Sequence, residues 1–106
     1  MSYNMHYSIV GRSCTMIYTT ESARRHGLTD DEVCYAWAHA IEYRRVRLDK
    51  RPPHYMALGT LPDGRVAELA AYSSGLDLVV FHCMTPTTPG FMHEYESAGK
   101  KGRSRR

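Results

Sequence analysis

The sequence lacks several features that would place it in a specialised class of protein. Its three cysteines, Cys14, Cys34 and Cys83, are odd in number and widely spaced, a pattern that fits neither a disulfide framework nor a cysteine-based zinc site. No apolar run approaches membrane-spanning length, and the N-terminus lacks the basic start and apolar segment of a secretion signal. Free thiols suit a reducing compartment, so we expect a cytoplasmic protein without a membrane partner.

Motifs for serine-based catalysis and for phosphate-binding loops are also missing. A metal site would have to combine His82, Cys83 and His93. Neighbouring residues of a strand point to opposite faces, so His82 and Cys83 would not share a metal. We therefore expect no metal and no other cofactor.

What the sequence does have is an uneven distribution of charge. The formal net charge is +3, and residues 100–106 hold five basic residues and no acidic one. The rest of the chain is slightly acidic, and its one basic stretch is 44–51. These two segments are where a polyanion would bind. The alternative for the tail is a disordered, solubilising end.

Length and composition indicate one small domain. The chain has 106 residues, of which 42% are hydrophobic, enough for a single core without disulfides or a metal. We expect an α+β domain over residues 1–98 and a basic disordered tail over 99–106. The N-terminal segment is the least regular, with a strand predicted over 14–19.

The first half of the chain carries signals for helices. Residues 21–26 form a short helical pattern that Gly27 ends. Thr29 followed by Glu32 predicts a capping box, in which each side chain bonds to the other residue's backbone amide. The apolar residues that follow recur at helical spacing through Ile41 and predict one buried stripe.

The second half of the sequence predicts extended segments separated by turns. Residues 42–48 alternate like an exposed or edge strand, and strands are predicted over 54–60, 65–72 and 76–84. The short turns between the last three strands indicate an antiparallel meander. The strand 76–84 is apolar on both faces and is predicted to be central. A short helix over 91–96 would pack back on the sheet.

Three short motifs resemble the BrnT-type toxins of bacterial toxin–antitoxin pairs, which belong to the RelE-like ribonuclease superfamily. The first is the basic segment, glycine stop and capped acidic helix start over 26–33. The second is the strand, Asp-Gly hairpin and arginine over 57–65, and the third is the final strand over 79–86, similar to an actinobacterial subgroup that often has His, Met and Pro there. The resemblance covers about two thirds of the chain.

The resemblance implies a fold, an activity and a partner. It implies helices packed on one face of a small antiparallel sheet, and metal-independent cleavage of RNA. It also implies a cognate antitoxin, a small DNA-binding protein, as partner. One departure concerns residues 83–89, which lack the basic cluster with which family members end this strand.

Cleavage of RNA without a metal needs a base, an acid and cations near the phosphate. His82 interrupts an apolar strand and can serve in either proton-transfer role; the alternative is a structural histidine bonded to backbone. Glu68 is the lone carboxylate of the preceding strand and could be a cross-strand neighbour of His82, or could face solvent. Arg65 follows the hairpin turn and could reach a phosphate, or could be a solvated arginine.

Residues for RNA binding are predicted in two places. Basic residues before Gly27 could contact phosphates, and a second stretch interleaves cations with rings, which suits single-stranded RNA. The alternative for each is a solvated surface. The candidates are Arg24, Arg25, His26, Arg44, Arg45, Arg47, His54 and Tyr55.

Two further interpretations stay open beside the toxin-like nuclease. One is a domain that keeps the RelE-like fold but binds RNA or a protein without cleaving. The other is an interaction module without nucleic acid, such as a homo-oligomer built on the exposed strand 43–48.

Overall fold

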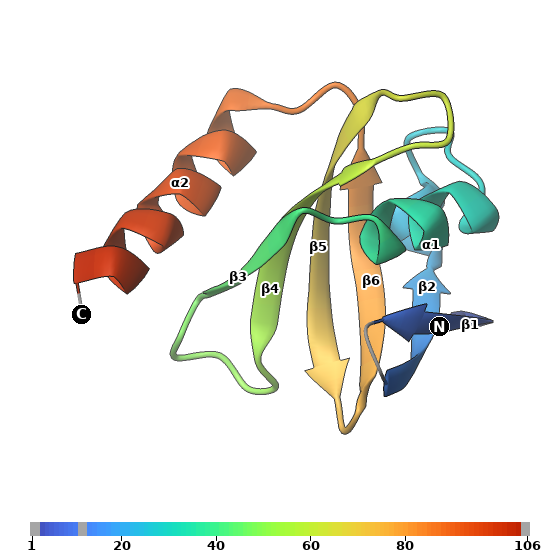
Figure 1. Ribbon diagram of the computed structural model, residues 1–106, viewed down its shortest axis with the longest axis horizontal. Coiled ribbons are helices and arrows are strands. Elements are labelled where there is room, and N and C mark those ends of the chain that lie inside the picture. The colour runs from blue at the N-terminus through green and yellow to red at the C-terminus, as the bar shows by residue number, and fades with distance from the viewer. Residues whose placement is uncertain (1–2, 11–12, 105–106) are drawn as a thin grey trace.

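The computed structural model describes the backbone of residues 3–10 and 13–104 and the side chains of residues 17–98. Its strands are β1 (Tyr3–Val10), β2 (Ser13–Thr20), β3 (Glu42–Val46), β4 (His54–Thr60), β5 (Val66–Ser74) and β6 (Asp77–Met84). Its helices are the 3-10 helix η1 (Glu21–Arg24), α1 (Asp30–Ala38) and α2 (Pro89–Ser104). The chain is therefore an α+β protein built on one sheet (Figure 1).

The sheet is mixed, with the strand order β1-β2-β6-β5-β4-β3. The predicted meander is confirmed, because β3, β4, β5 and β6 pair in sequence as antiparallel neighbours. The expectation of a purely antiparallel sheet is wrong, since β2 runs parallel to β6. The N-terminal hairpin β1–β2 thus continues the sheet beyond β6, where it brings Ile17 into the core. The sequence Gly11-Arg12-Ser13 predicts a turn before β2, and this turn falls mostly outside the described residues.

Helix α1 begins where the sequence predicts. The Thr29 hydroxyl accepts a hydrogen bond from the Glu32 amide at 3.2 Å, and the Glu32 carboxylate accepts one from the Thr29 amide at 2.9 Å. Both bonds of the capping box are present, so two backbone amides at the helix start have partners. The helix then lies across one face of the sheet.

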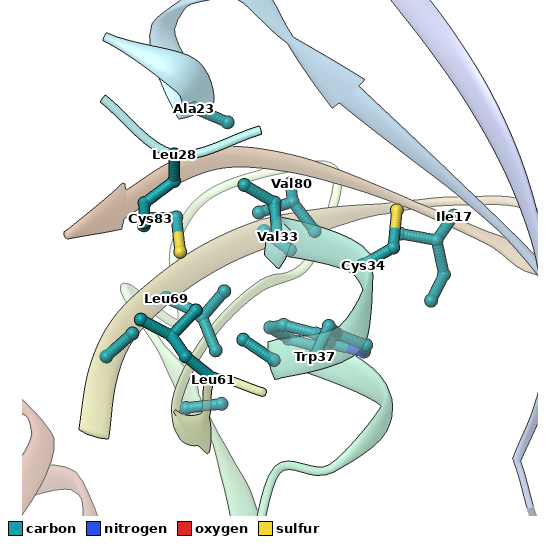
Figure 2. Packing of buried hydrophobic residues seen from close by; sticks show 14 residues of the cluster. Ile17, Ala23, Leu28, Val33, Cys34, Trp37, Leu61, Leu69, Val80 and Cys83 are labelled. Atoms are coloured by element: carbon teal, nitrogen blue, oxygen red, sulfur yellow. The ribbon is translucent and has the colours of Figure 1, made fainter. Parts of the chain in front are cut away.

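Close packing of α1 on the sheet depends on Gly59. A Cβ atom at this position would meet the backbone carbonyl oxygen of Ala36 in α1 and would lie 2.8 Å from Cδ1 of Leu69. The absence of a side chain lets helix and strand approach each other directly. The main core forms in this layer (Figure 2). Its largest fully buried apolar side chains are Ile17, Val33, Leu61, Leu69, Val80 and Cys83.

Helix α2 packs on the other face of the sheet. Its Phe91 and Tyr95 form a second, smaller cluster with Val46 and Met56. Met56 precedes the main-core residue Ala57 on β4, so the two clusters lie on opposite faces. The expected arrangement with helices on one face is wrong. Both faces of β4 are apolar, since Ala57 faces α1 whereas Met56 and Leu58 face α2. Figure 1 shows α2 beside β3 and β4, away from α1.

The final helix is also longer than the predicted one or two turns, since α2 continues through Ser104. Part of the segment expected to be a disordered tail is therefore helical, and residues 105–106 lie outside the described residues. The division into one domain and a basic tail stays a prediction. Among the described residues, no helix has the length and apolar character needed to cross a membrane.

Candidate active site

A β-bulge in β6 aims His82 away from the main core. Ala71 pairs with Val80, whereas Ala70, one residue earlier, pairs with His82, so Phe81 is an extra residue in the ladder. Without this bulge, strict alternation would place His82 on the same side as the buried Val80. With it, His82 points to the face of α2 while the next residue, Cys83, points into the core.

On that face, His82 forms a hydrogen bond with Glu68. Its Nε2 lies 2.7 Å from Oε2 of Glu68, which comes from the neighbouring strand β5. The carboxylate is almost completely buried, with 3% of the side chain exposed, whereas 30% of the His82 side chain is exposed. A buried carboxylate that holds one ring nitrogen fixes the orientation of the imidazole and leaves the other nitrogen, Nδ1, for chemistry.

Glu68 is itself held by the start of α2. Its Oε1 accepts hydrogen bonds from the amide of Thr88 at 2.6 Å and from the Thr88 hydroxyl at 2.9 Å. The Thr88 carbonyl accepts the first bond of the helix, from the Met92 amide at 3.0 Å. Glu68 therefore caps α2, where the helix dipole favours a negative group. The Glu68 carboxylate thus bonds both to the start of α2 and to His82.

Two rings flank the imidazole of His82. The ring of His26, from the loop after η1, meets it edge-on with centroids 5.6 Å apart and an interplanar angle of 78°. The ring of Phe91, in α2, lies 6.5 Å away at 26°. His26 is exposed. The site is thus a carboxylate-bound imidazole with a second, exposed imidazole beside it, and the imidazole ring is a common general acid or base.

Next to this pair, three rings form an aromatic cluster on the same face. The rings of Tyr72 and Phe81 stack with their centroids 6.0 Å apart. The His54 ring centroid lies 5.9 Å from that of Tyr72 and 5.8 Å from that of Phe81. All three side chains are half-buried. Because Phe81 is the bulge residue beside His82, the cluster adjoins the histidine pair. Rings of this kind are stacking partners for unpaired bases.

Arg65, the third predicted catalytic residue, lies on the hairpin between β4 and β5. Its Nε pairs with Oδ2 of Asp63 at 2.6 Å, and both side chains are about half exposed. The Arg65 amide also donates a hydrogen bond to Oδ1 of Asp63, and this bond is the chief cause that lowers the pKa of Asp63. Arg65 also lines a shallow hollow of about 330 Å³ together with Val66 and residues 85–87. Its ion pair is with Asp63 rather than with Glu68 or His82.

The basic residues before Gly27 have different roles. Nη1 of Arg24 donates to Oγ1 of Thr19 at 3.0 Å and to Oδ1 of Asp30 at 2.9 Å, so this arginine ties β2 to the start of α1. Arg25 and His26 are exposed. Of these three predicted RNA contacts, Arg24 makes its hydrogen bonds within the fold, and Arg25 and His26 face solvent.

Arg44 in β3 and Arg47, the residue after this strand, contact α2. Nη1 of Arg44 donates to the Tyr95 carbonyl at 2.8 Å, and its guanidinium lies 4.0 Å above the Tyr95 ring. Nε of Arg44 also donates to Oε2 of Glu42 at 3.0 Å, and this hydrogen bond is the chief cause that raises the pKa of Arg44. Arg47 pairs with Glu94 at 3.2 Å. These contacts explain why α2 lies along β3.

The remaining predicted RNA contacts do not share one surface. Arg45 pairs with Tyr55 across the two strands and so lies on the α1 face, whereas His54 faces the aromatic cluster on the other side. Tyr55 instead borders a hollow of about 210 Å³ with Trp37 and Tyr43. The structure therefore brings together His26, Glu68, His82 and His54, and separates them from Arg45 and Tyr55.

Sequence reasoning missed Thr88, Phe91 and the bulge at Phe81. A threonine directly before Pro89 is typical of a helix start, because proline is favoured at the first helical position. That signal could have located α2 and its cap. The bulge had no signal in the apolar run that contains it.

Within the described residues, no three histidine, cysteine, aspartate or glutamate side chains gather as a metal site would need. Comparison with known proteins gave no match to a protein-family model, a curated protein or a solved structure.

Proposed function

We propose that this chain is a metal-independent RNA endonuclease of the RelE-like toxin class, acting in the cytoplasm. The observation that carries the proposal is the His82–Glu68 pair, in which a buried carboxylate orients a half-exposed imidazole on the sheet face opposite the main core. Buried carboxylates next to an accessible imidazole are a recurring arrangement for proton transfer.

The proposed substrate is single-stranded RNA. The aromatic cluster of His54, Tyr72 and Phe81 beside His82 offers rings on which an unpaired base can stack. Arg25 and Arg65 are the exposed cations proposed to meet phosphate. The Arg65–Asp63 ion pair is exposed, so it contributes little and a phosphate can compete for the guanidinium.

The chemistry is attack of a 2′-oxygen on the adjacent phosphorus. A base removes the 2′-hydroxyl proton, the new bond from the 2′-oxygen to phosphorus forms, and the bond to the 5′-oxygen breaks while this oxygen takes a proton from a general acid or from water. The products are a 2′,3′-cyclic phosphate and a 5′-hydroxyl. His82 takes the proton, and Glu68 stabilises the imidazolium that results. In the cell, a small antitoxin would cover this face and hold the enzyme inactive.

The test is incubation of purified protein with single-stranded RNA in EDTA, followed by analysis of the product ends. We expect cyclic-phosphate ends, no cleavage of the same strand with 2′-O-methyl groups, and a loss of about 10²-fold or more for His82→Ala. His39→Ala is the matched control, because His39 is an exposed histidine that directly follows α1 as its C-cap, on the opposite side of the sheet. Intact RNA, or equal cleavage by His82→Ala, would contradict the proposal.

A second candidate is a binding domain with the same fold and no cleavage. It is favoured by the internal ion pairs of Arg24 and Arg47 and by the contacts of Arg44 with α2, which leave fewer cations for a phosphate. This candidate predicts salt-sensitive RNA binding without strand scission. Removing residues 100–106 should then weaken binding, and unchanged affinity would contradict a role for the tail.

A further inference from the structure

We propose that His26 is the second proton-transfer group of this site, the general acid that protonates the leaving 5′-oxygen. The inference rests on the proposed nuclease function and adds a catalytic residue to it. Its starting point is the edge-on contact of the His26 and His82 rings, with centroids 5.6 Å apart. Two imidazoles side by side at one open surface can serve one phosphate from both the attacking and the leaving side.

The backbone around His26 is fastened to the strand that carries His82. The Ser22 hydroxyl donates to the Phe81 carbonyl at 2.7 Å, directly at the bulge. Arg24 ties the same segment to Thr19 and Asp30. Gly27 then takes a φ of 90°, which turns the chain toward α1 directly after His26. The contact between the two histidines is therefore set by the fold at several points.

The surroundings of the two rings differ, and this difference assigns their roles. His82 donates to a buried carboxylate that stabilises it once it has gained a proton, as a base requires. His26 is exposed, and no hydrogen bond to its ring is found among the described residues. It can take up a proton from solvent before the reaction and release it during the reaction.

The step balances with these two groups alone. His82 Nδ1 takes the proton of the 2′-hydroxyl while the 2′-oxygen bonds to phosphorus. The bond from phosphorus to the 5′-oxygen breaks, and that oxygen takes the proton of the His26 imidazolium. His82 ends protonated and His26 neutral, and exchange of protons with water restores both. Arg25, adjacent in the sequence and exposed, is placed to attract the phosphate.

A pair of substrates tests this role. The first is an oligonucleotide with one ribonucleotide in a 2′-O-methyl background, placed at a step that the wild type cleaves. The second is the same strand with the leaving 5′-oxygen replaced by sulfur, which departs as a thiolate and needs no acid. His26→Ala should lower the rate on the oxygen substrate by about 10²-fold or more and change the rate on the sulfur substrate less than about tenfold. His82→Ala should lower both rates, and His39→Ala neither.

The outcomes separate the two proposals. Wild-type protein that cleaves neither substrate overturns the nuclease function, and this inference with it. Wild-type cleavage with an unaffected His26→Ala variant overturns the inference alone. Equal losses on both substrates also overturn it, because they would show that His26 does not protonate the leaving group. Circular dichroism and thermal unfolding of His26→Ala, and of the more conservative His26→Asn assayed beside it, show whether any loss occurs in a folded protein.

Discussion

The two faces of the sheet contrast in what they bury. Toward α1, the central strands present small and apolar residues, and the described core has no charged member. Toward α2, the same strands present Glu68, His82 and three half-buried rings beside a small apolar cluster. One face supplies most of the buried apolar contacts, while the other buries a carboxylate that bonds both to the start of α2 and to a half-exposed imidazole. We therefore propose that the first face chiefly supplies stability and that the second carries the function.

Substitutions at two neighbouring residues of β5 should give the largest difference between the two faces. Leu69 is fully buried in the main core, and Glu68 points to the other face. Leu69→Ala should lower the free energy of unfolding by about 3–4 kcal/mol through lost contacts and a residual cavity. Glu68→Gln should lower it by only about 1 kcal/mol, yet reduce RNA cleavage at least about tenfold by misorienting His82. Urea denaturation and cleavage rates per folded molecule measure both, and the reverse ranking would contradict the division of roles.

Gly59→Ala tests the close approach of α1. The new Cβ would meet the Ala36 backbone, which cannot move as a flexible side chain could. We expect a loss of about 3 kcal/mol, the upper end of the usual cost of overpacking. Gly90→Ala is the control, because a Cβ there meets nothing within 4 Å. Equal thermal stability of both variants would show that α1 does not lie so close.

Thr29→Ala tests the start of α1. The substitution removes the hydroxyl that accepts from the Glu32 amide, and helix caps of this kind stabilise by about 1 kcal/mol. Ser74→Ala, at an exposed site at the end of β5, is the control. Urea denaturation that gives equal midpoints for both variants would contradict the capping box.

The smallest effect concerns the thiols of the main core. Burial is the chief cause that raises the pKa of Cys34 and of Cys83 from 9.0 to about 12. At pH 8 the native thiolate fraction is then about one in ten thousand, so iodoacetamide should label neither residue until the protein unfolds. Because the unfolded chain would lose these protons first, their contribution to stability is present below pH 9 and is lost as the pH rises toward 12. Peptide mass spectrometry measures the labelling, and rapid reaction in the native state would contradict the burial.

The sequence predicted what depends on local pattern. The capping box at Thr29, the edge strand predicted over 42–48 and observed over 42–46, and the turns of the meander follow from side-chain chemistry within a few residues. The parallel pairing of β2 with β6 was missed, because it joins segments about 60 residues apart and no local signal fixes such pairing. Helix α2 was predicted too short, although Thr88-Pro89 signals its start.

For the site, the sequence singled out His82 and Glu68, and the structure places them in contact. It could not predict that contact, because the register depends on the bulge at Phe81 within a uniformly apolar run. The basic residues were predicted as RNA contacts from charge alone. Charge does not reveal that Arg24, Arg44 and Arg47 have acidic or carbonyl partners within the fold.

The most direct test of the contrast between the faces is NMR during titration with a single-stranded 2′-O-methyl oligonucleotide, which binds without being cleaved. The ring signals of His26, His82 and Tyr72 should shift in proportion to binding, whereas those of His39 and Trp37, on the α1 side, should stay unchanged. Shifts confined to the α1 side, or no shifts at RNA concentrations that saturate binding, would contradict the assignment of RNA recognition to the α2 face.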